Sequence, residues 1–137
     1  MIRPFQIEVP VETLELIRRQ VASYAWHEMP DDGGWAYGAN LEYMKELCAY
    51  WLDEFDWRVQ EAAINRFAHF IAPVDGIDLH FIHEKGSGPA PVPLIISHGW
   101  PGSIVEFLKI IEPLAHPERL GGDRKSTRLN SSHALIS

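Results

Sequence analysis

Apolar residues recur at helical spacing in the first part of the chain and predict two amphipathic helices. The first has Pro10 at its first position and is expected to end between Tyr24 and His27; its apolar face consists of Val11, Leu14, Ile17 and Val21. Asn40 is a good N-cap for the second helix. That helix has a broad apolar stripe formed by Leu41, Met44, Leu47, Cys48, Trp51, Leu52 and Phe55.

The pattern changes from helical to alternating near residue 66. Asp56 can cap a third helix from Trp57 to about Asn65, so we expect residues 1–66 to form a helical segment. Aromatic residues on these helices are interpreted as core, because core packing is their usual role.

Residues 67–84 read as an antiparallel β-hairpin. Apolar positions alternate with others over about 68–74 and 77–84. The intervening Asp75-Gly76 is a strong signal for a two-residue hairpin turn.

Residues 92–114 predict a strand, a tight turn and a helix. The run 92–97 is apolar without alternation, which is typical of a strand buried on both faces. Ser103 and Glu106 have the spacing of a capping box, and the helix is expected to end near Pro113. Its apolar face consists of Ile104, Phe107, Leu108, Ile111 and Leu114.

The turn between this strand and helix carries the candidate chemistry. Gly99 lets the backbone pass close to a ligand, and Pro101 fixes the turn and is compatible with a cis Trp-Pro bond. Trp100 presents a backbone N–H beside an apolar ring. The alternative is a purely structural turn, and for the His98 ring we expect a bond within the loop and no catalytic role.

The chain resembles the N-terminal region of microsomal-type epoxide hydrolases over about residues 2–116. The resemblance rests on motifs that agree in order: Ile2-Arg3-Pro4-Phe5, Trp35, Tyr37-Gly38, Leu41-Glu42-Tyr43-Met44-Lys45, Tyr50-Trp51, Phe55-Asp56-Trp57-Arg58, Gln60-Glu61, Asn65-Arg66-Phe67, Asp75-Gly76, His80-Phe81-Ile82-His83 and His98-Gly99-Trp100-Pro101-Gly102-Ser103. It implies an α/β fold in which a helical segment precedes the first strands and first helix of an incomplete α/β-hydrolase.

This resemblance also implies the chemistry of the whole protein. In that family an Asp on a nucleophile elbow opens an epoxide to an ester, two Tyr hydroxyls polarise the epoxide oxygen, and a His with an acidic partner activates water. Trp100 would contribute a backbone donor to the oxyanion hole and part of the substrate wall. His98, Gly99, Pro101 and Gly102 would shape the loop, and the N-terminal helices would be structural.

The catalytic residues themselves are not found in this sequence. An elbow nucleophile needs small flanking residues after a strand, whereas Asp123 is followed by Arg124 and lacks a preceding strand. Tyr24, Tyr37, Tyr43 and Tyr50 precede the hydrolase strands and are expected to pack between helices. We therefore expect an N-terminal fragment that is inactive alone.

The C-terminal tail differs from the rest of the chain. Residues 123–137 hold three basic and one acidic side chain, although the whole chain has a formal net charge of −7. The run from Asp123 to His133 resembles the translation of a sequencing-library adapter. We expect native coding sequence to end near Gly122, and residues 117–137 to lack a fixed fold.

Composition excludes several other classes of function. The acidic balance argues against a nucleic-acid partner, and no apolar run approaches the roughly 18 residues of a membrane span. Cys48 is the single cysteine, which fits a cytoplasmic protein without disulfides. His80 and His83 would face opposite sides of a strand, so we expect neither they nor Glu84 to bind a metal, and we expect no cofactor.

Two other functions stay open at this stage. A His-Gly-x-Pro turn also occurs in serine esterases and haloalkane dehalogenases, which differ in the nucleophile. A noncatalytic helical module could instead use its tryptophans to bind a partner. The substrate, its stereochemistry and the oligomeric state are not encoded in these residues.

Overall fold

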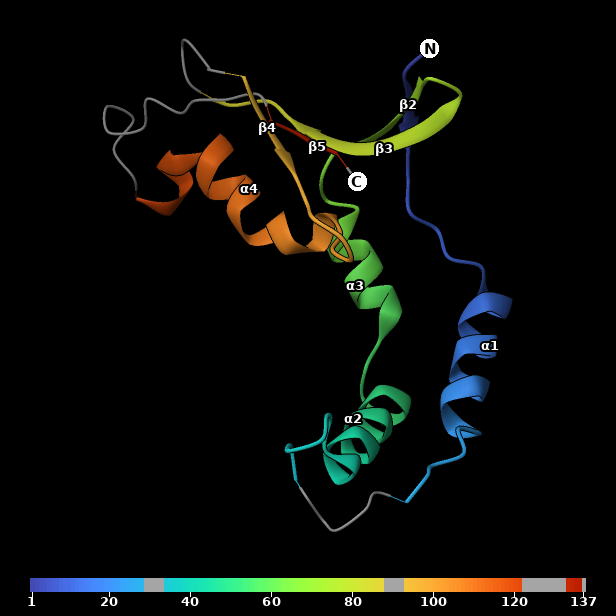
Figure 1. The fold of residues 1–137 in the computed structure, drawn as a ribbon. Helices are drawn as coiled ribbons and strands as arrows, with labels where there is room; N and C mark the ends of the chain where they lie inside the picture. The colour runs from blue at the N-terminus through green and yellow to red at the C-terminus, as the bar shows by residue number, and fades with distance from the viewer. Residues whose placement is uncertain (29–33, 88–92, 122–132, 137) are drawn as a thin grey trace. The chain divides into compact units, whose positions relative to one another are not determined.

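A computed structural model describes residues 1–28, 34–87, 93–121 and 133–136, the last four by their backbone (Figure 1). The chain divides into two compact units, one formed by Glu8–Gln60 and one by Met1–Ile7 together with Glu61–Ser137. The first unit is helical, and the second contains a five-stranded sheet.

The helical unit contains α1 (Val11–Ala22) and α2 (Leu41–Asp53). Pro10 is the N-cap of α1 and lies outside the helix, and α1 ends two residues before the predicted range. It ends there because the Tyr24 amide bonds to the Val21 carbonyl (3.4 Å) in a tighter turn. The Asn40 side chain accepts a hydrogen bond from the Tyr43 amide (2.9 Å), which confirms the predicted cap of α2.

The apolar faces of these two helices are only partly covered. No residue of α1 or α2 is buried, and Trp51 is 41% exposed. The prediction that the aromatic stripe of α2 is core is therefore wrong for this chain, because one neighbouring helix covers only part of a broad stripe. Polar contacts help to join the segments: the Arg18 guanidinium donates to the Leu52 carbonyl, and that of Arg58 to the Val9 carbonyl (2.7 Å).

Helix α3 (Trp57–Ile64) begins at the predicted cap. The Asp56 carboxylate accepts hydrogen bonds from the amides of Arg58 (2.8 Å) and Val59 (3.4 Å). Asn65 follows the helix, and its side chain forms two hydrogen bonds with the backbone of Ile7, at 2.9 and 2.7 Å. This paired contact ties the N-terminal segment to the end of α3.

The predicted hairpin is formed by β2 (His69–Val74) and β3 (Ile77–Glu84). The strands pair antiparallel up to Val74 and Ile77, which leaves Asp75 and Gly76 as a two-residue loop. Both loop residues have positive φ, 49° and 83°, as a type I′ hairpin turn requires. The turn signal in the sequence is thereby confirmed.

Residues Arg3–Phe5 form strand β1, which pairs antiparallel with β2 at the edge of the sheet. The sequence pattern predicts a helical segment over residues 1–66, and this prediction is wrong for Arg3–Phe5. Proline is tolerated at an edge strand, so Pro4 does not prevent the pairing. Arg3 also forms an ion pair with Asp78 on β3 (2.9 Å).

The remaining strands give the order β1-β2-β3-β5-β4 (Figure 1). Strand β5 (His133–Ile136) lies antiparallel to β3 and parallel to β4 (Leu94–Ser97), so it separates β4 from the hairpin. We expected the hairpin beside β4 and no regular structure after residue 116. Both expectations are wrong here, because β5 satisfies the backbone groups of two open strand edges at once.

Strand β4 is also less buried than its sequence predicts. Its burial alternates, and Ile95 is 66% exposed. A fully apolar strand needs a cover on both faces of the sheet, and the described residues cover one. The prediction of a strand buried on both faces is therefore wrong for this chain.

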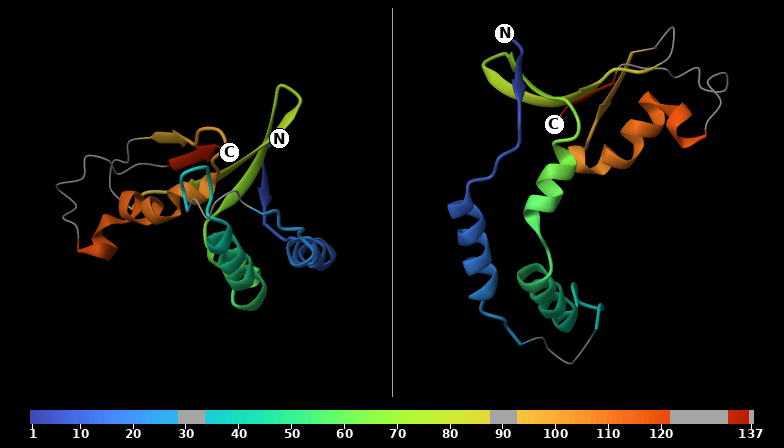
Figure 2. Two further views of the ribbon diagram at one scale, coloured as in Figure 1. Left: turned by 60° about the horizontal axis from the view of Figure 1, so that its bottom comes forward. Right: turned by 180° about the vertical axis from the view of Figure 1, so that it is seen from behind.

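The strand is followed by a short 3₁₀ helix η2 (Ile104–Phe107), then by α4 (Leu108–Ala115) and by η3 (Pro117–Leu120). Helix α4 continues past Pro113 to Ala115 and lies on one side of the sheet (Figures 1 and 2). The buried apolar core consists of Ile64, Ile71, Ile82, Ile104, Ile111 and Ala115. Each large aliphatic side chain buried there contributes about 1.5–3 kcal/mol.

A pair of histidines, His69 buried and His80 half-buried, joins α3 to the hairpin. The Nε2 of His69 lies 2.9 Å from the Ile64 carbonyl, and its Nδ1 lies 3.0 Å from Nε2 of His80. Because a carbonyl only accepts, His69 donates from Nε2, and its Nδ1 shares the second hydrogen bond with Nε2 of His80. Burial, and secondarily His69, hold the pKa of His80 below its ordinary value of 6.5.

Candidate functional site

The candidate site is the loop from His98 to Gly102, between the end of β4 at Ser97 and the start of η2 at Ile104. The Trp100–Pro101 peptide bond is cis, the geometry with which the sequence was compatible. The Gly102 amide donates to the Gly99 carbonyl (2.6 Å) and closes a tight turn across these two residues.

A capping box fixes the loop to the following helix. The Ser103 hydroxyl accepts from the Val105 amide (3.3 Å), and the Glu106 carboxylate accepts from the Ser103 amide (3.2 Å). The predicted capping box is confirmed. Since these bonds use amides at the start of the helix, they hold the C-terminal end of the loop in one place.

Trp100 is at the most open part of the loop. It is 97% exposed. Within the described ranges its amide donates no hydrogen bond, in contrast to the amides of Gly102 and Ser103. An amide outside secondary-structure pairing is what a backbone donor to a reacting anion requires.

His98 contacts its own loop. Its Nδ1 lies 3.1 Å from the Gly99 carbonyl, so this nitrogen carries the proton and donates. A bond from the ring to the backbone of its own loop is what we predict for His98 as a loop-shaping residue.

The two glycines differ in their surroundings. A Cβ built on Gly99 meets nothing within 4 Å, whereas one built on Gly102 collides with the Glu106 carboxylate and lies 2.8 Å from the Gly99 carbonyl. The sequence pattern predicts a close approach of the backbone at Gly99 and gives no such prediction for Gly102. The capping box was the available signal, because its carboxylate folds back over the N-terminal end of the helix.

Of the other residues considered from sequence, the rejected nucleophile Asp123 lies outside the described residues. The four tyrosines belong to the helical unit, and each is about half exposed or more. Two of them contact other rings: Tyr24 with Trp26 at 4.8 Å and Tyr43 with Trp35 at 5.3 Å between centroids. None approaches full burial, so the predicted packing between helices is only partial.

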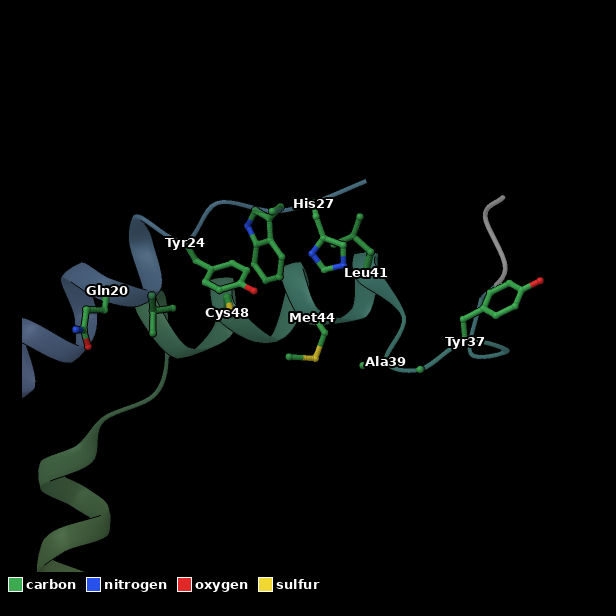
Figure 3. A pocket seen from close by; sticks show the side chains of 11 residues that line it. Gln20, Tyr24, His27, Tyr37, Ala39, Leu41, Met44 and Cys48 are labelled. Atoms are coloured by element: carbon green, nitrogen blue, oxygen red, sulfur yellow. The ribbon is translucent and has the colours of Figure 1, made fainter. Parts of the chain in front are cut away.

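An open apolar cleft of about 630 Å³ lies in the helical unit (Figure 3). Tyr24 and His27 from the segment after α1 face Met44 and Cys48 of α2, with Tyr37 at the far end. The cleft is the uncovered part of the helices' apolar faces. It lies in a different unit from the loop.

A cluster of polar side chains joins the end of β3 to the end of α4. The Nε2 of His116 lies 3.1 Å from the Glu84 carboxylate, and the His116 side chain is only 11% exposed. Its Nδ1 has no hydrogen-bond partner among the described residues and lies 3.9 Å from Glu118. Glu118 accepts from the Ser87 hydroxyl (2.8 Å). No sequence signal connects residues 32 positions apart, so this cluster was not predicted.

Among the described residues, no three His, Cys, Asp or Glu side chains gather as a group that could hold a metal ion. No helix there has the length and apolar character needed to cross a bilayer.

The fold and the loop define a class. A hairpin, then a strand, a tight turn and a capped helix on one side of the sheet form the opening part of an α/β-hydrolase. Aspergillus niger epoxide hydrolase superposes with a TM-score of 0.83 at 28% identity, covering 100% of this chain and 35% of that one.

Sequence comparison identifies the family. Residues 2–107 match the family model described as "Epoxide hydrolase N terminus". Epoxide hydrolase 1 of Sus scrofa is 37% identical over 124 residues, and juvenile hormone epoxide hydrolase 1 of Ctenocephalides felis is 34% identical over 120. These alignments cover 88% and 85% of this chain. The chain belongs to the epoxide hydrolase family and corresponds to its N-terminal part; it spans about a quarter of the length of these relatives.

Proposed function

We propose that the whole protein converts small apolar epoxides to vicinal diols through an ester of an active-site Asp, and that this chain supplies the oxyanion-hole loop. Membership of the epoxide hydrolase family supports the reaction class. The amide of Trp100, which donates to no described residue and lies at the open tip of the loop after β4, carries the assignment of the loop.

The reaction has two covalent steps. In the first, the Asp carboxylate attacks an oxirane carbon, the carbon–oxygen bond breaks, and the released oxygen takes a proton from a Tyr hydroxyl. In the second, a His removes a proton from water, and the resulting hydroxide adds to the ester carbonyl. The tetrahedral oxyanion then expels the diol oxygen, which takes the proton held by that His, and the remaining carboxylic acid returns a proton to the Tyr oxygen and becomes a carboxylate again.

Trp100 acts in the second step. Its amide donates to the oxyanion as negative charge forms on the former carbonyl oxygen, and a donor already fixed in place requires no reorganisation. Loss of one such donor costs about 10²–10³ in rate in other hydrolases. The exposed indole of the same residue offers an apolar wall for the substrate.

The test requires the coding sequence continued beyond Gly122. The longer protein should hydrolyse an aryl epoxide, and mass spectrometry after rapid quenching should detect protein carrying one epoxide equivalent as an ester. Replacing the elbow Asp by Ala should abolish both. The 137-residue chain alone should show no turnover.

Two results would contradict the proposal. A Ser at the elbow, with ester cleavage and no epoxide opening, would make the whole protein an esterase. Epoxide hydrolysis without any covalent intermediate would remove the step in which the Trp100 amide is assigned a role.

A further inference from the structure

We propose that Glu106 is a positioning residue for the ester-hydrolysis step, acting through Ser103 and Gly102 on the loop that carries Trp100. This inference rests on the proposed function of the loop. It concerns a side chain that contacts no reacting atom and whose position is set by the turn and the capping box together.

The Glu106 carboxylate reaches back over the turn. It accepts a hydrogen bond from the Ser103 amide (3.2 Å), and it lies so close to the Cα of Gly102 that no Cβ fits between them. Gly102 in turn donates to the Gly99 carbonyl (2.6 Å), on the other side of Trp100. Glu106, Gly102 and Gly99 are thus packed in series from the helix to the residue before Trp100.

The same contacts decide which amides stay available. The Gly102 amide is taken by Gly99 and the Ser103 amide by Glu106, while Pro101 has no N–H. Among the described residues, the Trp100 amide has no hydrogen-bond acceptor and stays available. Without the carboxylate, the Ser103 amide would be free to bond elsewhere, and the turn that orients Trp100 would lose its support on the helix side.

A small displacement of this loop should affect one step more than the other. The oxyanion forms only during ester hydrolysis. The Trp100 amide therefore stabilises the transition state of that step and gives no such stabilisation to oxirane opening. Catalytic donors must lie within about 0.5 Å of their productive position. Loss of the Glu106 contact should therefore slow hydrolysis selectively.

The experiment uses the whole protein and compares Glu106→Ala with Glu106→Gln. In single-turnover kinetics, Glu106→Ala should slow ester hydrolysis by about 10- to 100-fold, less than loss of a whole oxyanion donor, and leave oxirane opening within about threefold. The ester should accumulate in mass spectra. Glu106→Gln keeps an oxygen acceptor for the Ser103 amide and should restore hydrolysis to within about fivefold of the unsubstituted protein.

Glu112 provides the matched control. It lies on α4 away from the loop, is 42% exposed and pairs with Arg119 at 3.6 Å. Glu112→Ala should leave both steps unchanged. The amplitude of the oxirane-opening burst counts correctly folded molecules, so a loss of stability in Glu106→Ala does not obscure the two rates.

Equal slowing of both steps in Glu106→Ala, or no slowing of either, would overturn the inference. Failure of Glu106→Gln to recover hydrolysis would also overturn it, because the proposed contact needs only an acceptor oxygen. Failure of the proposed function is a separate result: the unsubstituted protein would then form no ester from an epoxide.

Discussion

At the scale of single residues, Gly99 and Gly102 show how one loop can contain two glycines under different constraints. Neither has a positive φ, so backbone conformation alone does not demand glycine at either position. At Gly102 the surroundings demand glycine, because the Glu106 carboxylate and the Gly99 carbonyl occupy the space of a side chain. Around Gly99 the described residues leave open space, so a side chain would meet no obstacle among them.

Gly102→Ala should therefore destabilise the whole protein, whereas Gly99→Ala should not. The added methyl group forces the Glu106 carboxylate off the Ser103 amide and displaces the Gly99 carbonyl, and such overpacking costs about 1–3 kcal/mol. Urea-induced unfolding of both variants measures the difference. Equal free energies of unfolding for the two variants would show that the loop relaxes around Gly102 without cost.

His80 should make the local stability of the hairpin depend on pH. Burial and His69 lower the pKa of His80, so between that lowered pKa and 6.5 the unfolded state binds more protons than the folded state. The contribution of His80 to the stability of the hairpin is therefore fully present above about pH 6.5, and it is lost as the pH falls through the lowered pKa. Amide exchange in β2 and β3, corrected for its intrinsic pH dependence, should reveal more frequent opening at lower pH.

A matched pair of variants tests this assignment to His80. His80→Gln should remove the pH dependence, because glutamine does not titrate. His83 lies on the same strand and is exposed, so His83→Gln should keep it. A pH dependence that survives in His80→Gln would place its origin in another group.

At the scale of elements, the hairpin and the strand-turn-helix lie where the sequence predicts them. The strands, however, pair with partners other than those predicted. A strand exposes donors and acceptors on both edges, and β3 and β4 each have an edge that the hairpin and α4 leave open. Strand β5 pairs with Phe81–Glu84 on one side and with Leu94–Ser97 on the other. The sheet is continuous because a short extended segment occupies this position.

Leu135→Pro should break this continuity. Proline removes a ladder donor in a central strand, so amides of β3 and β4 at the β5 interface should exchange faster, and the newly open edges should promote self-association. Leu135→Val preserves strand propensity and should leave exchange unchanged. Hydrogen exchange and size-exclusion chromatography provide the two measurements. Unchanged exchange in Leu135→Pro would mean that β5 does not protect these edges.

At the scale of the whole molecule, much apolar surface remains uncovered. The helical unit has no buried residue in α1 or α2. Its described residues line the cleft of about 630 Å³ and another of about 690 Å³, between α1 and the segment from Trp51 to Arg58. The sheet unit buries only a small set of aliphatic side chains. Since burial of apolar surface is the main favourable term in folding, we expect low stability for this chain by itself.

Residues 1–122 alone should consequently lack a sharp cooperative melting transition above about 50 °C, where mesophile domains normally melt. Circular dichroism during heating tests this, and binding of a hydrophobic dye reports the exposed apolar surface. The 137-residue chain, which retains β5, should bind less dye. A sharp transition above that temperature in residues 1–122 would show that the small core suffices.

The sequence by itself determined the features that depend on neighbouring residues. Asn40 and Ser103 cap helices through contacts within three positions, and Asp75-Gly76 sets the hairpin register through its own backbone angles. The His-Gly-Trp-Pro-Gly loop and its family could be recognised for the same reason. Local geometry and periodicity are written in consecutive residues.

Only the tertiary structure decided the features that depend on distant partners. The pairing of β1 with β2, the place of β5 between β3 and β4, and the contact of His116 with Glu84 join segments that no local pattern relates. The exposure of Ile95 and Trp51 was decided in the same way, because an apolar residue is buried only where another surface covers it. The restriction at Gly102 likewise arises from a side chain that folds back from the next helix.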